Sequence, residues 1–387
     1  MKAENGEIIN SFTHLLNYIY KNMAQTINQR IDALRALLKR EGIDAFIIPS
    51  TDPHLSEYPA DRWKSREWIS GFTGSAGTIV VTADKAGLWT DSRYFLQAAS
   101  QLEGSGIELY KLALPETPSI TEFLLHELHT GQAVGLDGQT YSAAEASALA
   151  NKLSRKEIKL DTSADLIEGI WKDRPAVPGN PIFEMPEALS GASVHEKLDL
   201  INNQLRSEGA DCLILAALDE IAWTFNIRGT DVTYNPVVVS YAFVSEDESV
   251  LFIKPEKLTA EITEHLKKEG VTLAEYSMIQ RYLSRLPENS RVFVDMNKTN
   301  VSLYDAIPGS CTIVEGISPA NHLKSIKNET EIKGFQNAVV KDGVALTKFY
   351  IWLEKQMAEG AQVTEISAAE KLTALRAEQP QYIMDSF

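Results

Sequence analysis

One pattern occurs twice in this 387-residue chain, and it restricts the fold more than any other feature. In the first copy, Thr26 and Gln29 form a candidate capping box at the start of a helix. The helix is expected to end at Gly42, and the apolar residues 44–48 follow it. Such a short run is typical of a strand buried on both faces, as in a parallel sheet. The helix carries one apolar stripe, made of Ile27, Ile31, Leu34 and Leu38.

The second copy begins at Ser193, and Glu196 completes its capping box. Gly209 repeats the glycine stop, and residues 211–215 repeat the apolar run. Val194, Leu198, Ile201 and Leu205 repeat the stripe. Farther along, Trp223 and Gly229 correspond to Trp68 and Gly74, and residues 292–295 correspond to residues 134–137. We infer that the chain contains two copies of one α/β domain.

The spacing between the copies shortens after Ile48, which predicts an insert in the first copy before Trp68. The inserted stretch holds the polar residues His54, Glu57, Asp61 and Arg62.

Prolines mark the boundary between the two copies, because they fix the backbone and break regular structure. They are Pro175, Pro178, Pro181 and Pro186. We therefore predict four parts. Residues 1–22 are an N-terminal extension, residues 23–173 are domain I, residues 174–322 are domain II, and residues 323–387 begin a third domain.

The third part opens with helical signals. Asn328 and Glu331 form another capping box, and Thr364 precedes a helix that is expected to run to about Glu378. Residues 382–387 are partly apolar and resemble the opening of a strand. Because a sheet needs partners for such a strand, we expect this third domain to be truncated.

Composition and charge argue against several classes of protein. The net charge of −16 disfavours binding to nucleic acid or to an anionic membrane through the overall field. The two cysteines, Cys212 and Cys311, are too far apart for a disulfide framework or a CxxC site, which favours a reducing compartment. No apolar run approaches the length of a membrane span, and the first 22 residues lack a signal-peptide pattern. We expect a cytoplasmic protein.

Two glycine-containing segments are candidates for a binding site. Gly71, Gly74 and Gly77 invite comparison with a phosphate-binding loop, but the Lys-Ser/Thr pair of a Walker loop is missing, and a strand rather than a helix should follow. A tight turn is the favoured interpretation. The segment around Arg93 should end a strand at Thr90, and its arginine could bind a carboxylate or a peptide carbonyl. The alternative is that Arg93 pairs with Asp91 and holds the turn.

The sequence gives only weak evidence for metal ligands or catalytic acids. His54 and Glu57 would share a face of a helical turn, but no third ligand is placed near them, and a polar surface turn is favoured. His126 and His129 are interpreted as the solvated face of a helix. Asp219 and Glu220 would point to opposite sides if extended, so they do not form a catalytic pair. We find no complete catalytic constellation in the sequence.

Four strings resemble aminopeptidase P, the Xaa-Pro aminopeptidase of the three-domain type in the creatinase/prolidase "pita-bread" metallopeptidase family. They are residues 65–78, 88–99, 170–175 and 217–231. The resemblance runs from about Met23 to Phe387. It implies two related creatinase-type N-terminal α/β domains in tandem, followed by the truncated start of an α+β pita-bread domain.

The resemblance also implies a function. Family members release the N-terminal residue from peptides with proline in second position, and two divalent metal ions, usually manganese, are bound by two Asp, one His and two Glu. All five ligands would follow Phe387, so we expect no metal ligand, no catalytic residue and no activity in this chain alone. Arg93 matches the one functional position that can be transferred, a substrate-binding arginine, although Ser92 stands where many members have glycine. The full-length parent is expected to act on proline-containing peptides and could be a homodimer. The alternative is a non-catalytic peptidase-like module that binds peptides or protein partners.

Overall fold

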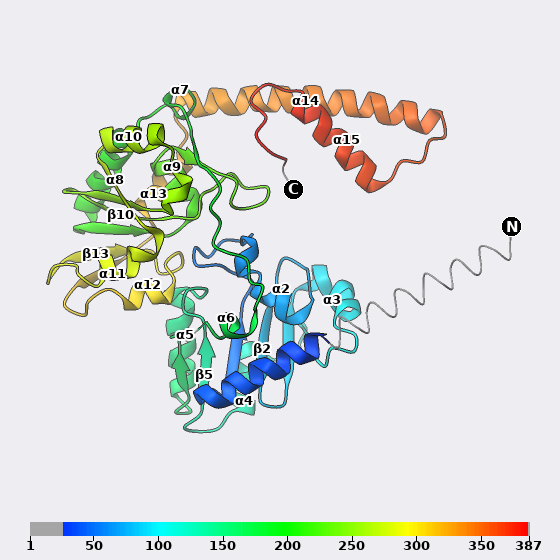
Figure 1. Ribbon diagram of the computed structural model, residues 1–387, viewed down its shortest axis with the longest axis vertical. Coiled ribbons are helices and arrows are strands. Elements are labelled where there is room, and N and C mark those ends of the chain that lie inside the picture. Colours follow the sequence, from blue (N-terminus) through cyan, green and yellow to red (C-terminus); the bar gives the residue numbers. More distant parts are fainter. Residues whose placement is uncertain (1–25, 164, 386–387) are drawn as a thin grey trace. The chain divides into compact units, whose positions relative to one another are not determined.

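The computed structural model describes residues 26–163 and 165–385 (Figure 1). The chain divides into two compact units. The first comprises residues up to 178, 214–217 and 277–316, and the second comprises residues 179–213, 218–276 and 317–387.

The first unit contains a six-stranded sheet of order β4-β3-β2-β1-β5-β6. The central strand β1 pairs antiparallel with β2 and parallel with β5, so the sheet is mixed and not the parallel one expected. A helix over residues 26–41 precedes it. The elements that follow this helix are β1 (Ala45–Ile48), η1 (Asp61–Trp63), α2 (Ser65–Ser70), β2 (Thr78–Thr82), β3 (Ala86–Thr90), η2 (Ser92–Tyr94), α3 (Phe95–Gln101), β4 (Glu108–Lys111), α4 (Ile120–Glu127), β5 (Ala133–Leu136), α5 (Ala143–Ser154), β6 (Lys159–Asp161) and α6 (Leu166–Ile170).

The second six-stranded sheet has the order β12-β11-β10-β8-β13-β14. Strand for strand, this order repeats that of the first sheet. The elements from the linker to the end of this sheet are β7 (Phe183–Glu184), α7 (Glu187–Ser190), α8 (Val194–Glu208), β8 (Cys212–Leu215), α9 (Leu218–Thr224), β9 (Ile227–Arg228), β10 (Tyr241–Ser245), β11 (Ser249–Phe252), η3 (Pro255–Lys257), α10 (Ala260–Lys268), β12 (Val271–Ala274), η4 (Tyr276–Met278), α11 (Ile279–Leu283), β13 (Arg291–Val294), α12 (Val301–Asp305) and β14 (Thr312–Glu315).

Strand directions repeat together with strand order. The pairs β2–β3 and β10–β11 are both antiparallel, whereas β3–β4 and β11–β12 are both parallel. The edge pairs β5–β6 and β13–β14 are parallel as well. The predicted duplication is therefore confirmed. The insert is confirmed too, because residues 49–64 separate β1 from α2, whereas only residues 216–217 separate β8 from α9.

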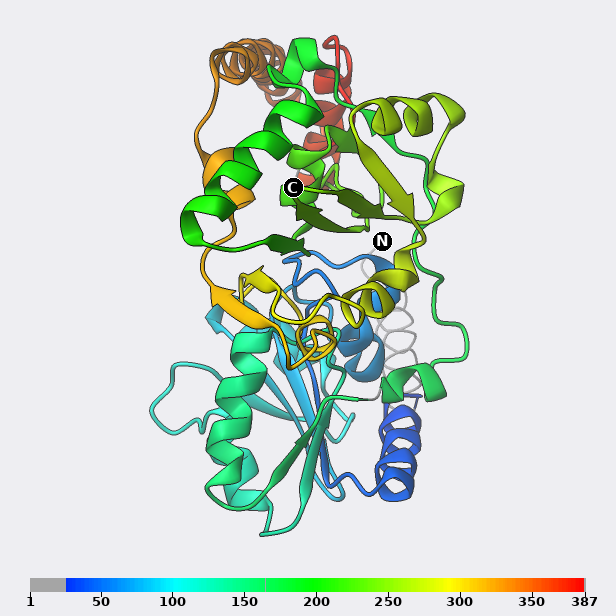
Figure 2. The ribbon, with the colours of Figure 1, turned by 90° about the vertical axis from the view of Figure 1, so that its left-hand side faces the viewer.

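Alternation along β1 places its side chains in two different cores. Phe46 and Ile48 pack with the stripe of the helix over residues 26–41, whereas Ala45 and Ile47 pack with residues of α4 and α5. Figure 2 shows that helix and α5 on opposite sides of the strands of this sheet. In the second copy, Val194, Leu198, Ile201 and Leu205 are buried as predicted.

The predicted helix ends agree with the structure except at one position. Ser193, Asn328 and Thr364 are N-caps with reciprocal capping boxes, and Gly42 and Gly209 adopt positive φ just after their helices. Thr26 is itself helical and is therefore not the N-cap, so this part of the prediction is wrong.

The proline-rich stretch has little regular structure, as predicted. Residues 171–182 form neither helix nor strand, and Pro186 is the N-cap of α7.

The last part of the chain consists of α13 (Pro319–Ser325), α14 (Glu329–Ala358) and α15 (Glu365–Ala377). The prediction of a strand at the end of the chain is wrong for residues 382–385, which form no strand; the last two residues lie outside the described chain. The physical reason is that a strand needs a hydrogen-bonding partner. Among the described helices, none combines the length and the apolar character that crossing a bilayer requires.

The repeated stripe should dominate the stability of the second copy. Ile201 is fully buried on α8, whereas the adjacent Leu200 is 47% exposed. We expect Ile201→Ala to lower the free energy of unfolding by about 2–5 kcal/mol, because it leaves a cavity in the core. Leu200→Ala is the matched control and should change it by less than about 0.5 kcal/mol. Urea unfolding followed by circular dichroism measures both, and equal losses would contradict the assigned core.

Candidate functional site

The turn after β3 carries the arginine that the sequence singled out. The strand ends at Thr90 as predicted, and Asp91 caps η2 by accepting a hydrogen bond from the Arg93 backbone N–H at 3.1 Å. The Asp91 carboxylate also accepts from Arg93 Nε at 2.9 Å and from Nη2 at 2.8 Å. The predicted pairing of Arg93 with Asp91 is therefore confirmed.

This pairing fixes the orientation of a charged group that remains open to solvent. The Arg93 side chain is 63% exposed, and its guanidinium carbon lies 5.1 Å from the centre of the Tyr94 ring. Hydrogen bonds from Arg93 lower the pKa of Asp91, and the bonded carboxylate raises the pKa of Arg93. Both groups are thus charged at neutral pH, and the arginine is held in place rather than free to rotate.

A second arginine, Arg66, supports the glycine-rich turn that precedes β2. Arg66 is buried and donates to the carbonyl oxygens of Phe72 and Gly74 at 2.5 Å each, and to Ser50 Oγ at 3.0 Å. Burial lowers the pKa of Arg66 to about 10. These bonds hold the glycine-rich turn against the domain.

The glycine-rich segment is a tight turn and not a phosphate loop, as favoured from the sequence. Strand β2 follows it directly, so no helix N-terminus is available to an anion. Gly74 is required by space, because a Cβ there would lie 2.3 Å from Phe72 Cζ and 2.7 Å from Tyr94 Cδ1. The Tyr94 hydroxyl in turn lies 2.6 Å from Ser75 Oγ.

Residues of the insert approach the same arginine, which the sequence did not reveal. Burial raises the pKa of Tyr58, the neighbouring Glu57 raises it further, and the charge of Arg93 lowers it. Glu57 and Tyr58 thus lie within electrostatic reach of Arg93. The only sequence signal was their position in the insert.

The segment around Asp52 and His54, at the start of the insert, is buried and not on the surface as expected. The segment around His54 was interpreted as a polar surface turn, but Asp52 and His54 are both buried. Asp52 Oδ1 accepts from the backbone N–H groups of His54 and Ser56 at 2.9 Å each, and His54 Nδ1 lies 2.8 Å from the carbonyl oxygen of Ala216. These hydrogen bonds compensate for part of the cost of burying these polar groups.

The other weak candidates do not converge on a site. His126 is exposed on α4 with Nδ1 2.9 Å from Glu127, and His129 lies beyond the end of that helix. Asp219 and Glu220 are helical and not extended as assumed: Asp219 pairs with Lys324, and buried Glu220 accepts from Asn321 Nδ2 at 3.1 Å. In the described part of the chain, no three His, Cys, Asp or Glu side chains are grouped so that they could hold a metal ion.

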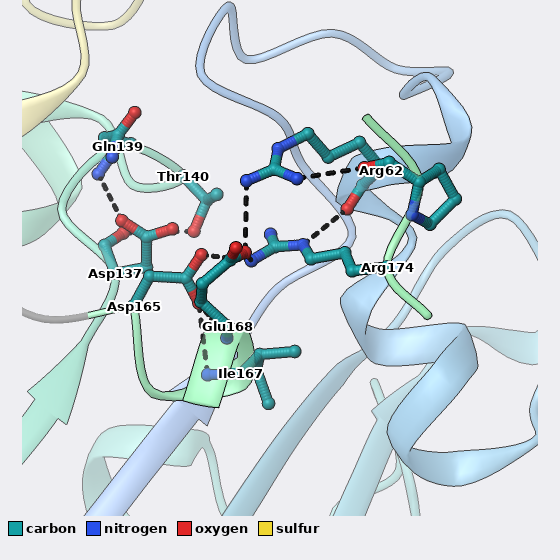
Figure 3. A network of polar contacts seen from close by, with 9 residues as sticks. Arg62, Asp137, Gln139, Thr140, Asp165, Ile167, Glu168 and Arg174 are labelled. Atoms are coloured by element: carbon teal, nitrogen blue, oxygen red, sulfur yellow. Dashed lines mark hydrogen bonds and ion pairs between the residues drawn. The ribbon is translucent and has the colours of Figure 1, made fainter. Parts of the chain in front are cut away.

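A network of acids and arginines joins the insert to the linker (Figure 3). Glu168 accepts from Arg62 Nη2 at 3.0 Å and from Arg174 Nη1 at 2.8 Å, and Arg174 also pairs with Asp165. Arg62 Nη1 donates to the Pro175 carbonyl oxygen at 2.9 Å. Arg174 belongs to one of the family-like strings, but nothing in the sequence linked it to Arg62.

Asp137 lies beside this network at the end of β5. Its Oδ1 accepts from the Gln139 backbone N–H at 2.9 Å. Burial, together with the charge of Asp165, raises the pKa of Asp137 to about 7, although Arg174 and Arg62 act in the opposite direction. The sequence marked Asp137 only as part of the repeat, and it did not mark Asp165.

Comparison with known protein families gives a separate match for each of the two copies. The family described as "Creatinase/Prolidase N-terminal domain" matches residues 30–170 and, in a second form, residues 173–331.

Curated relatives match nearly the whole chain. A protein of Coprinopsis cinerea named "Probable Xaa-Pro aminopeptidase P" is 37% identical, over 91% of this chain and 59% of its own length. The Drosophila melanogaster "Xaa-Pro aminopeptidase ApepP" is 36% identical, over 94% of this chain and 61% of its own.

A solved structure is also similar. The X-prolyl aminopeptidase of Caenorhabditis elegans, described as a cytosolic enzyme with a di-nuclear active site, has a TM-score of 0.88 and 30% identity. The match covers 94% of this chain and 61% of that one. The chain thus spans about three fifths of the length of these relatives.

The raised pKa of Asp137 predicts a pH dependence of stability. Between pH ~4 and ~7 the Asp137 carboxyl group is protonated in the folded chain and ionised in the unfolded chain. Its contribution to the free energy of unfolding is therefore full below the ordinary aspartate pKa and is lost as pH rises through about 7. Asp137→Asn cannot lose that proton. The stability of the variant relative to the wild type should therefore rise across this pH range and then level off.

Urea unfolding at a series of pH values tests this expectation. Asp247→Asn, at an exposed position, is the matched control. A difference between Asp137→Asn and the wild type that is constant with pH would contradict the shifted proton affinity.

Proposed function

Because this chain belongs to the Xaa-Pro aminopeptidase P family, with its creatinase/prolidase N-terminal domains, we propose that it is part of an enzyme that acts on peptides. The enzyme releases the N-terminal residue when proline is in second position. The observation that carries this proposal is the similarity over more than nine tenths of the chain to proteins named Xaa-Pro aminopeptidase.

The domain arrangement is part of the proposal. Residues 23–173 and 174–322 form the two creatinase-like domains, residues 1–22 extend the first, and residues 323–387 begin the catalytic domain. The longer relatives support this division, because the family matches end at residue 331 and the relatives continue well beyond the length of this chain.

An apolar surface on α14 and α15 supports further sequence in the parent protein. Its side chains are 43–71% exposed, a large amount for aliphatic and aromatic groups along two helices. The members of this surface are Ile332, Val339, Val340, Val344, Tyr350, Ile351, Met357 and Ile366. Covering such a face stabilises a fold, so we propose that the rest of the catalytic domain packs on it.

We propose that the parent binds two divalent metal ions, manganese by the family resemblance, through residues outside this chain. The di-nuclear site described for the nematode enzyme supports the number of ions. When bound, such a pair activates water for attack on a carbonyl group. The present chain would contribute to substrate binding and not to this chemistry.

Arg93 is the residue that we assign to substrate binding. Nε and Nη2 of its guanidinium bind Asp91, which leaves further N–H donors for a peptide carbonyl or carboxylate. The fixed orientation reduces the entropy lost when a peptide is bound. Tyr94 and Tyr58 would border the same contact.

The proposed enzyme is cytoplasmic, as the nematode enzyme is described. Its partners are proline-containing peptides and, in the parent, a second copy of itself. Neither nucleic acid nor membrane is proposed as a partner.

The chain alone should be inactive. Residues 1–387, purified and supplied with Mn²⁺, should release no arginine from the peptide Arg-Pro-Pro. The control is the product of the same gene read beyond codon 387, assayed identically, which should release it. Arginine release by the shorter chain would refute the assignment of the metal ligands to later residues.

Arg93→Ala in the longer product should lower kcat/KM for Arg-Pro-Pro about 10- to 100-fold, because a charge-assisted hydrogen bond is lost. Arg40→Ala is the matched control, since Arg40 also pairs with an adjacent carboxylate on the surface of the same unit. Steady-state kinetics on both variants gives the comparison. Equal values for Arg93→Ala and Arg40→Ala would show that Arg93 only holds its turn.

A further inference from the structure

The second unit contains a pocket that neither the family resemblance nor the proposed function explains. Its volume is about 450 Å³. Its lining comes from α7, α8, α9, β9, α13 and the first turns of α14, together with Met185, Lys327 and residues 235–237. All of these elements belong to one compact unit. The pocket is large enough for a small organic molecule.

Two basic side chains line the inside of this pocket. Lys197 is 2% exposed, and its ammonium group donates to the Trp223 carbonyl oxygen at 2.9 Å and to Asn226 Oδ1 at 2.5 Å. Arg228 donates through Nη1 to the carbonyl oxygens of Ala222 at 2.6 Å and Ile227 at 2.9 Å. All of these acceptors are uncharged. Within residues 26–163 and 165–385, neither Lys197 nor Arg228 forms an ion pair with a carboxylate.

Among the residues that the structure describes, Glu331 is the one carboxylate whose charge acts on both Lys197 and Arg228, and it already has another role. Glu331 Oε2 accepts from the Asn328 backbone N–H at 2.9 Å as part of the capping box of α14. Its charge raises the pKa of Lys197 and of Arg228, but burial outweighs it and lowers both, that of Lys197 to about 8. The positive charge inside the pocket is therefore poorly compensated.

The rim adds to this positive charge. Lys324 pairs with Asp219, whereas Lys327 donates only to the backbone carbonyl oxygens of Lys324 and Ser325, at 2.9 and 3.3 Å. The lining therefore holds four basic side chains and two acidic ones. This balance is opposite in sign to the net charge of −16 of the whole chain.

Apolar groups complete the lining. The ring of Trp223 lies 4.8 Å from Lys197 Nζ, and Phe335, Met185 and Leu189 also line the pocket. A ligand that fits this lining has one anionic group for the cations and an apolar body for the rings and aliphatic chains.

We propose that this pocket binds a small organic carboxylate with an aromatic or branched apolar body. The carboxylate lies against Lys197 and Arg228, and the body lies between Trp223 and Phe335. Binding joins α14 to α8 and α9, so an occupied pocket also stabilises the second unit.

The experiment is isothermal titration of the full 387-residue chain with 2-naphthoate. The uncharged analogue 2-naphthalenemethanol has the same ring system and tests the role of the charge. Lys197→Met removes the buried cation and keeps an unbranched side chain. Lys327→Met, at an exposed rim position, provides a second variant that should fold normally even if Lys197→Met does not. Lys333→Met, exposed on α14 and outside the lining, is the matched control.

We expect naphthoate to bind with sub-millimolar affinity and to raise the melting temperature. The alcohol and Lys197→Met should each weaken binding at least about tenfold, in line with the loss of a charge-assisted hydrogen bond. Lys327→Met should weaken binding by a smaller factor, and Lys333→Met should not change it. The proposal is overturned if naphthoate does not bind, if the alcohol binds equally well, or if Lys197→Met and Lys327→Met both bind naphthoate like the wild type.

Discussion

The burial of β1 and β8 is the constraint on which the rest of the structure depends. Each strand is four residues long and buried along its whole length. In the first copy, Phe46 and Ile48 need a helix on one face, while Ala45 and Ile47 need α4 and α5 on the other. A strand with two buried faces cannot lie at the surface of a two-layer fold. The repeated strand order follows from meeting this requirement twice.

Several polar groups that become buried in the fold are bonded to neighbouring groups. Arg66 donates to two backbone carbonyl groups, and Asp52 accepts from two backbone N–H groups. Lys257 and Asp231 form a buried ion pair in the second unit. Lys197, like Arg66, donates only to uncharged acceptors among the described residues, but Lys197 also lines a pocket. Its place in the lining makes the Lys197 charge available to the proposed ligand.

The proposed function accounts for the different character of the exposed turn at Arg93 and of the buried core. In the proposed enzyme, a part of these domains that meets a substrate must remain accessible. The turn provides this: Asp91 orients Arg93, Gly74 allows Tyr94 to pack closely, and Arg66 holds the segment in place.

The sequence by itself determined the duplication, the buried helical stripes and most helix ends, and it offered the pairing of Arg93 with Asp91 as one of two alternatives. These depend on local spacing, caps and apolar periodicity, which a sequence displays directly. Only the tertiary structure decided that Asp52 and His54 are buried, that Arg62 meets Glu168 across 106 positions, and that Lys197 and Arg228 share a pocket. Burial and long-range electrostatics depend on which segments the chain brings together. No periodicity in the sequence encodes that information.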